Sequence, residues 1–419
     1  MTKKLVHTPP GVRDLYNLEY ARKETVENNI LKTFKLYGYR GIQTPTFEFF
    51  DIFSKEKGSV PSHEMYKFID RDGNTLVLRP DITPSIARSA AKYFSEEDMP
   101  IRLCYKGNTF TSQYRYRGRL SETTQMGAEL LGDETSDADA EMIAMLIDSL
   151  LAAGLEKFQV EIGHIGFFQG LLQEAGLEEE DEVQLRTLVE EKNYFGVEEM
   201  LRQRDIPPKI KEAFAQLPKL FGSLEQVERA KQITGNTVFQ QAARYLEKLY
   251  VILQNYGLEQ YVSFDLGMLG NYRYYTGIIF KAYTYDTGEA IATGGRYDKL
   301  IAQYGKNSAS VGFGIYIDAL LSAMTRQKID IDTDIVSTIL LYERRHKKLA
   351  IQLAGNMRRN GTGLQMMKKY YEKSLEDYIA YARRSYISEI LFLDETGSTV
   401  WVIHCETGEK RAEDVRQLL

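Results

Sequence analysis

LRPDITPS, residues 78–85, is the first of four stretches that decide the fold of this chain. The second runs from YKGNTF (105–110) to QMGAE (125–129), the third is YRYYTGIIF (272–280), and the fourth is ATGGRYDKL (292–300) followed by SVGFGIYIDAL (310–320). Glycine, proline and asparagine break these stretches, and IRLCYKGNTF (101–110), YYTGIIFKAYTY (274–285) and EAIATGG (289–295) predict short strands joined by turns. Asp81 and Thr83 follow another predicted strand, and a helix is expected from about Gly314 to Thr325.

Helical sequence surrounds and interrupts these strands. The spacing of apolar residues predicts a helix from about Tyr16 to Tyr37, ending at Gly38, and another from Ala138 to Ala153. FQVEIGHIGFF (158–168) is expected to be a strand. Residues 170–256 are charged and poor in strand formers, which predicts a helical insertion in a β-rich domain.

The pattern changes after QKIDIDTD (327–334), a polar and charged stretch that we interpret as a linker. Beyond it, strands such as VSTILLY (336–342) alternate with helices, one of them opened by a capping box at Ser374 with Asp377. The last eight residues, AEDVRQLL, are expected to form a helix. We therefore predict a core domain at residues 1–327 and a small α/β domain at residues 334–419.

Composition and charge exclude several classes of protein. The 53 Lys and Arg residues against 59 Asp and Glu give a net charge of −6, which provides no bulk attraction to nucleic acid. Cys104 and Cys405 are far apart and lack metal-ligand spacing, so we expect no metal site and a reducing compartment. The most apolar segment, Met142–Gly154, is short and contains Asp148. We expect a cytoplasmic protein with no membrane partner.

Each of the four stretches also has a plain structural interpretation. Tyr274 and Tyr275 could be core aromatics, and Gly294-Gly295 could be a simple turn, because it lacks the context of a phosphate-binding loop. YRYRGR (114–119) is by default a solvated turn, although arginines between aromatic residues also suit phosphate binding.

Taken in order, the four stretches resemble those of histidyl-tRNA synthetase and its relatives. LRPDITPS is similar to the family's LRPEGT segment, YKGNTF to QMGAE resembles motif 2, YYTGIIF with GGRYDKL resembles the histidine-specific motifs, and SVGFGIYIDAL resembles motif 3. The resemblance covers nearly the whole chain. It implies an α+β fold, with a class II synthetase-like antiparallel sheet core, a helical insertion and a C-terminal anticodon-binding-like α/β domain.

The arginines that adenylation requires are missing from these motifs. Adenylation of a carboxylate builds negative charge, and the family neutralises it with three arginines. By resemblance these positions fall on Thr111, Gly270 and Ala319, and Asp318 would repel a triphosphate. Losing one such contact typically costs about 10²–10³ in rate. We therefore expect no adenylation, no catalytic residue and no cofactor.

The resemblance still implies a pocket for histidine, whose candidate residues are Asp81, Thr83, Arg119, Gln125, Glu129, Tyr274 and Tyr275. Asp81 and Thr83 would hold the α-amino group, and Glu129 with one of the tyrosines would contact the imidazole. The α-carboxylate has lost two natural partners, for which Arg119 or Arg273 would substitute. In the alternative interpretation the polar residues bond only one another, and the pocket is vestigial.

A synthetase-like scaffold without activation chemistry resembles the regulatory subunits of ATP phosphoribosyltransferase. That family implies a hetero-oligomer with the short catalytic subunit, in the first step of histidine biosynthesis, with histidine as effector. The region around Pro45 resembles motif 1, which implies a homodimer. The alternatives are a tRNA-binding or histidine-sensing protein and an active synthetase. Lys368-Lys369 and Arg383-Arg384 are the basic spots of a C-terminal domain that the family often lacks.

Overall fold

The structure is a computed structural model that describes residues 7–54, 60–112, 120–270, 274–285, 287–333 and 336–418. The chain divides into two compact units, one made of Met1–Asp14 and Val26–Ile331 and the other of Leu15–Thr25 and Asp332–Leu419. Helix α1 (Asn17–Leu36) contributes to both. No helix in the described part of the chain is long and apolar enough to cross a membrane.

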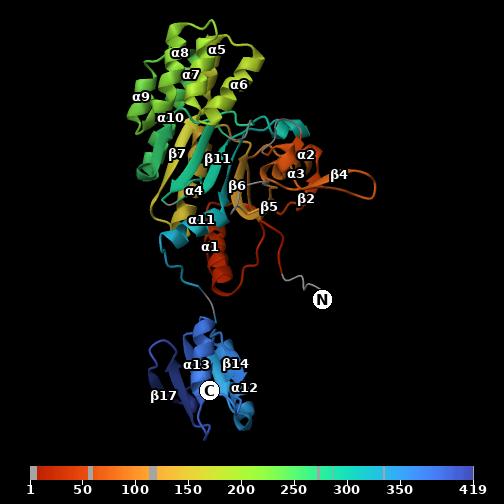
Figure 1. Cartoon of the computed structure of the whole chain (residues 1–419), viewed down its shortest axis with the longest axis vertical. Coiled ribbons are helices and arrows are strands. Elements are labelled where there is room, and N and C mark those ends of the chain that lie inside the picture. The colour runs from red at the N-terminus through yellow and green to blue at the C-terminus, as the bar shows by residue number, and fades with distance from the viewer. Residues whose placement is uncertain are drawn as a thin grey trace. The chain divides into compact units, whose positions relative to one another are not determined.

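The larger unit is built on a nine-stranded sheet with the order β1-β5-β6-β12-β11-β10-β7-β9-β8 (Figure 1). Neighbours are antiparallel except for the parallel pairs β1–β5 and β7–β9. The strands, in sheet order, are Arg40–Gly41, Ile101–Phe110, Glu122–Leu131, Ser310–Tyr316, Ala292–Arg296, Ile278–Thr284, Phe158–His164, Val262–Asp265 and Phe221–Gly222. The four stretches that decide the fold therefore meet in or beside one sheet.

The two faces of this sheet are covered differently. On one face, α1, α4 (Ser136–Ala152) and α10 (Thr237–Asn255) pack on an apolar core, in which Phe34 meets Phe313 edge to face. On the other face, Ile86 of α3 (Thr83–Tyr93) and Ile82 directly before this helix are buried against the strands. α11 (Ile317–Arg326) follows β12 directly, so the helix predicted from Gly314 was wrong for residues 314–316, which pair with β6 instead. The second face is the more polar and carries the candidate site.

The segment predicted as a helical insertion contains helices and one short strand, β8. Its helices are α5 (Ile165–Ala175), α6 (Glu179–Glu190), α7 (Tyr194–Arg202), α8 (Pro208–Gln216), α9 (Glu225–Ala230) and α10, and they gather at one end of the sheet (Figure 1). The predicted strand FQVEIGHIGFF was wrong beyond His164. Nδ1 of His164 accepts the N–H of Gly166 at 3.0 Å, which caps α5 and ends the strand.

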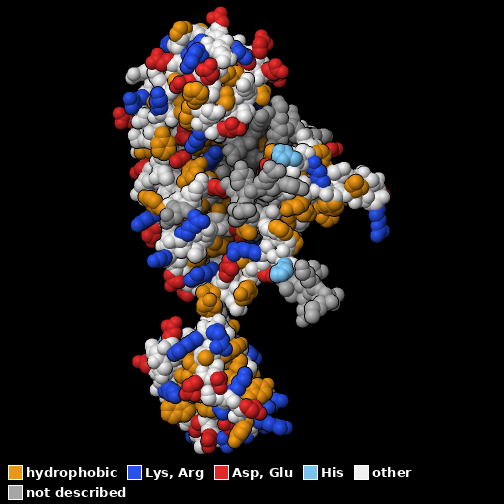
Figure 2. Space-filling view, viewed as in Figure 1, with side chains coloured by type: hydrophobic (Ala, Val, Ile, Leu, Met, Phe, Trp, Pro, Cys, Tyr) orange, Lys and Arg blue, Asp and Glu red, His pale blue; other side chains and the backbone are white. Residues whose placement is uncertain are grey.

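A separate three-stranded sheet of the larger unit has the order β2-β4-β3, formed by Phe47–Phe49, Thr75–Leu78 and Lys67–Ile69. The short helix α2 (Asp51–Ser54) follows β2. Hydrophobic side chains are visible on the arm that this sheet forms (Figure 2). Phe47, Phe49 and Phe68 are 52%, 54% and 40% exposed, and we name them the phenylalanine face.

The smaller unit is a five-stranded sheet with the order β14-β13-β15-β16-β17, formed by Gln365–Lys368, Thr338–Tyr342, Glu389–Leu393, Thr399–His404 and Lys410–Asp414. Its helices are α12 (Lys347–Arg359), α13 (Leu375–Arg384) and α14 (Val415–Leu418). The capping box of Ser374 and Asp377 is confirmed at the start of α13. The predicted final helix was wrong for residues 412–414, because they pair with β16 and give its outer edge a partner. The predicted α+β fold class is confirmed.

Candidate functional site

Glycines in the central strands make room for a site on the polar face of the large sheet. A Cβ atom at Gly312 of β12 would lie 1.5 Å from Oε2 of Glu129, and one at Gly295 of β11 would lie 2.6 Å from the ring of Tyr275. Neither glycine has a positive φ angle in the structure, so close approach is the reason for the missing side chain. Side chains from β6 and from the segment before β10 therefore lie directly on the strands.

These side chains enclose a small cavity. It is lined by Asp81, Thr83, Gln125, Tyr274, Tyr275, Thr293, Tyr297, Gly312, Phe313 and Gly314. The space open to water is about 10 Å³, which is enough for about one water molecule. The described tyrosines must therefore move apart before an amino acid can enter.

Glu129 lies at the base of this cavity with none of its surface exposed. Its Oε1 accepts the hydroxyl of Thr83 at 2.8 Å, and its Oε2 accepts the hydroxyl of Tyr297. Burial raises the pKa of Glu129 to about 8, against the two hydrogen bonds, which lower it, and the nearby charge of Asp81 adds to the rise. The carboxyl group is thus costly to ionise in the absence of a cation.

Asp81 is the second buried carboxyl group of the site, and only 3% of its surface is exposed. Its Oδ1 accepts the N–H of Ile82 at 2.7 Å, and its Oδ2 accepts the hydroxyl of Tyr274 at 3.4 Å. Burial raises its pKa, while hydrogen bonds from Ile82, Thr83 and Gln125 oppose the rise. Two buried carboxyl groups near one cavity favour a ligand that brings positive charge.

Gln125 carries an unsatisfied polar atom at this cavity. The side chain is 5% exposed, and its Oε1 has no hydrogen-bond partner among the described residues. Leaving a buried acceptor unpaired costs about 1–3 kcal/mol. A ligand that donates a hydrogen bond here would recover this cost, which argues against an arrangement whose polar groups satisfy only one another.

The structure brings most of the predicted site together. Asp81, Thr83, Gln125, Tyr274 and Tyr275 line one cavity and Glu129 closes it, whereas Arg119 and Arg273 lie outside the described residues. Sequence reasoning missed the five other lining residues, which are Thr293, Tyr297, Gly312, Phe313 and Gly314. Tyr297 stands inside the quoted stretch ATGGRYDKL, and only the pairing of β11 with β12 brings Thr293 beside Gly314.

Thr111, Gly270 and Ala319, where arginines were expected by resemblance, have structural roles of their own. The N–H of Thr111 donates to the carbonyl of Ser121 at 2.9 Å, Gly270 lies against the ring of Tyr275, and Ala319 packs on the large apolar core. Asp318 accepts the N–H of Thr124 at 2.7 Å and so ties α11 to β6. The carboxylate of Asp318 is therefore held in place beside Ala319.

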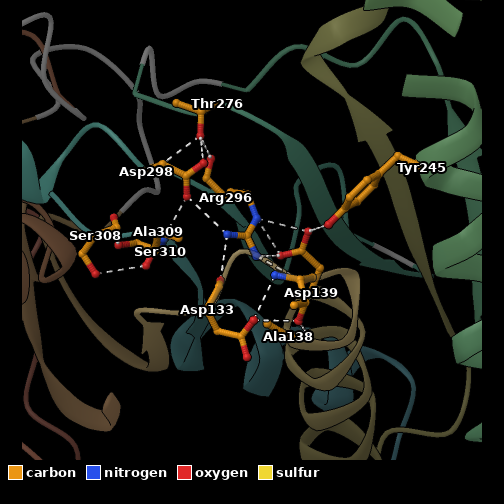
Figure 3. A network of polar contacts seen from close by, with 11 residues as sticks. Asp133, Ala138, Asp139, Tyr245, Thr276, Arg296, Asp298, Ser308, Ala309 and Ser310 are labelled. Carbon is orange, nitrogen blue, oxygen red and sulfur yellow. Dashed lines mark hydrogen bonds and ion pairs between the residues drawn. The ribbon is translucent and has the colours of Figure 1, made fainter. Parts of the chain in front are cut away.

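Behind the cavity, Arg296 anchors the end of β11, directly before Tyr297 (Figure 3). Its guanidinium binds Oδ1 of Asp139 through Nη2 at 2.6 Å and reaches Oδ1 of Asp298 through Nη1 at 3.2 Å. Tyr245 of α10 donates its hydroxyl to the same Asp139, and Thr276 donates to Asp298 at 3.0 Å. Burial disfavours the charged guanidinium, but the charge of Asp139 outweighs it and the pKa of Arg296 is raised.

The fold and the buried acidic pocket define a protein of the histidyl-tRNA synthetase class. A family model described as histidyl-tRNA synthetase matches residues 11–320. A solved structure from Bacillus halodurans, described as an ATP phosphoribosyltransferase regulatory subunit/histidyl-tRNA synthetase, is 31% identical with a TM-score of 0.83, and covers 93% of this chain and 98% of its own.

Within that class, two curated relatives have the same name, ATP phosphoribosyltransferase regulatory subunit. The relative from Acetivibrio thermocellus is 39% identical over 87% of this chain and 88% of its own. The relative from Ruminiclostridium cellulolyticum is 37% identical over 99% of both chains, so the match extends through the C-terminal unit. The chain belongs to the family of ATP phosphoribosyltransferase regulatory subunits.

Proposed function

We propose that this chain is the non-catalytic regulatory subunit that joins a short-form ATP phosphoribosyltransferase catalytic subunit and makes it sensitive to histidine. The observation that carries the proposal is a buried pocket with two carboxyl groups, in a chain whose sequence by resemblance has other residues at the positions of the three adenylation arginines. The pocket keeps the means to bind a cationic amino acid but lacks the charge to activate its carboxylate. The transferase would catalyse the first step of histidine biosynthesis.

Histidine fits the chemistry of the pocket. Its α-amino group would bind Asp81, Thr83 and Gln125. It would donate a hydrogen bond to Oε1 of Gln125, which has no partner among the described residues. Its imidazole would lie against Glu129 and the tyrosines, since a carboxyl group and a hydroxyl group can match both ring nitrogens. Arg119 stays a predicted contact. Because the cavity is nearly closed, binding would shift the tyrosine walls, and that shift is a means of coupling to a partner.

We further propose that the chain is a cytoplasmic homodimer within the larger assembly, with the domain boundaries 1–327 and 334–419. The phenylalanine face supports the dimer, because an exposed apolar patch on a small sheet is a common mark of a protein interface. The basic pairs of the C-terminal unit would be solvated surface, so tRNA is not expected to be a partner.

A reconstitution tests the proposed function. The chain would be mixed with the short catalytic subunit from the same organism, and formation of phosphoribosyl-ATP would be followed while histidine is titrated. We expect activity to depend on the mixture and to fall as histidine rises. With the Glu129→Gln variant, the complex should form normally but need at least about 10-fold more histidine, since a hydrogen bond to a charged group contributes about 1.5–3 kcal/mol.

Two results would count against the proposal. If the folded catalytic subunit forms no complex with the chain, the regulatory role is wrong. If the complex forms and Glu129→Gln leaves the histidine response unchanged, histidine acts somewhere other than this pocket. Exposed Glu395 offers a matched control, because Glu395→Gln removes a carboxylate from the C-terminal unit and should not alter the response.

A further inference from the structure

Lys281 of β10 lies on the same face of the sheet as the candidate pocket. It stands directly opposite Thr293 of β11, which lines the cavity, and Thr293 in turn stands opposite Gly314. Residues directly opposite each other on neighbouring strands point to the same face, and neighbouring strands are about 4.7–4.9 Å apart. The flexible four-carbon stem of Lys281 thus starts one strand beyond the cavity wall.

The ammonium group of Lys281 has no direct partner in the described part of the chain. The residue is only partly exposed, yet no ion pair or hydrogen bond joins it to a described side chain. Glu161 faces it on β7 and Asp265 lies nearby on β9, close enough to favour its charge but not paired with it. Burial lowers the pKa of Lys281, and the nearby charge of Lys192 lowers it further, while the charges of Asp265, Glu161 and Glu190 oppose the fall.

The pocket has assigned partners for two of the three polar groups of an amino acid such as histidine. The amino group belongs at Asp81 and Gln125, on the side of the cavity formed by α3 and β6, and the imidazole belongs at Glu129. Thr293 lines the cavity on the side of the sheet where β10 follows β11. The α-carboxylate would point that way, and Lys281 is the cation that lies beyond Thr293.

We propose that Lys281 supplies the positive charge that receives the α-carboxylate of the bound amino acid, in place of the missing arginines. This inference rests on the proposed function, because it assumes that histidine binds in this pocket. It differs from the expectation that Arg119 or Arg273 fills this role. A single lysine on the sheet would hold the carboxylate without gathering the charge that adenylation needs.

The test compares two ligands that differ only at this group. L-histidinol keeps the amino group and the imidazole of L-histidine but has an alcohol in place of the carboxylate. Calorimetric titration of the full chain with each ligand would be done for wild type, Lys281→Met and Lys281→Arg. We expect Lys281→Met to weaken histidine binding by about 10–100-fold, as expected for a charge-assisted contact, and to change histidinol binding by less than about twofold. Lys281→Arg should keep the preference for histidine.

Lys106→Met is the matched control, because Lys106 lies on β5 between residues that face the site and pairs with Glu27 of α1 on the other face. It should leave the ratio of the two affinities unchanged.

Equal losses of affinity for both ligands in a folded Lys281→Met variant, or no loss, would overturn the role of Lys281. A wild-type chain that binds histidinol as well as histidine would also overturn it while leaving the pocket in place. A wild type that binds neither ligand would instead overturn the histidine pocket itself.

Discussion

At the scale of single residues, the buried carboxyl group of Glu129 has a raised pKa that makes the stability of the chain depend on pH. The carboxyl group is fully buried and accepts hydrogen bonds from the hydroxyl groups of Thr83 and Tyr297. Burial raises its pKa to about 8. A group whose pKa is higher in the folded chain than in the unfolded chain binds more protons when folded. Folding is therefore favoured while Glu129 keeps its proton, and this contribution is lost as the pH rises.

This leads to a prediction for Glu129→Gln, an isosteric change that cannot ionise. Between about pH 4.5, the ordinary value, and about pH 8, the wild type should lose stability relative to the variant by up to about 1.4 kcal/mol per pH unit. Below this window the two proteins should differ by a nearly constant amount. Urea unfolding at a series of pH values measures the difference.

The difference between the two proteins isolates Glu129 from the other groups that titrate, such as Asp81 with its raised pKa and His164, whose pKa burial lowers to about 4. Parallel curves of unfolding free energy against pH would show that Glu129 is ionised in the folded chain throughout. Saturating histidine should flatten the wild-type curve, because a bound cation stabilises the carboxylate.

At the scale of elements, the Arg296 network joins β11 to α4 and α10 (Figure 3). Arg296 is 6% exposed and Asp139 is fully buried. Removing one partner of such a pair leaves an uncompensated charge, so Arg296→Met should lower the free energy of unfolding by about 3–5 kcal/mol. The double change with Asp139→Asn should cost less than the sum of the two single changes. Urea denaturation of the four proteins completes the cycle.

A surface pair provides the contrast for this cycle. Arg411 and Glu413 are 3.0 Å apart in the smaller unit, with side chains that are 69% and 30% exposed. Arg411→Met should cost no more than about 1 kcal/mol, because water screens the pair. If Arg296→Met lowered the free energy of unfolding by no more than Arg411→Met, solvent would screen the Arg296 network as it screens the surface pair.

The elements also show what the sequence alone could predict. The resemblance located Asp81, Thr83, Gln125 and Glu129, because each lies in a quoted stretch that is similar to a motif of the family. Lys281 lies within a strand of unremarkable composition, and its role depends on the register between β10 and β11. The register depends on which residues of a distant strand pair with this one, and the periodicity of a single strand does not reveal its partners. The same limit explains residues 412–414, where pairing with β16 overrode a helical pattern.

At the scale of the whole molecule, the chain has the fold of a synthetase, and the proposed function assigns it recognition in place of catalysis. Glycines of β11 and β12 make room for the buried carboxyl group and tyrosines of the pocket, and Tyr245 of α10 is linked to Arg296 through Asp139. Such a scaffold can only bias a partner through the states that it adopts, so its assembly is part of its function. The subunit contacts are therefore the next feature to test.

The phenylalanine face provides the last prediction. Phe47 and Phe68 meet edge to face with ring centroids 5.8 Å apart, and Phe49 lies two residues along the same strand, so the three rings share one side of the small sheet. Glutamates in place of Phe49 and Phe68 would put two charges into a dimer contact, where each must be desolvated. We expect this double variant to elute as a monomer in size-exclusion chromatography with light scattering, while the wild type elutes as a dimer.

Phe195→Glu is the control, because it changes a 78% exposed ring on α7 and should leave the dimer intact. A double variant that stays dimeric would place the contact on another surface, and a wild type that is monomeric at all concentrations would show that assembly requires the catalytic subunit.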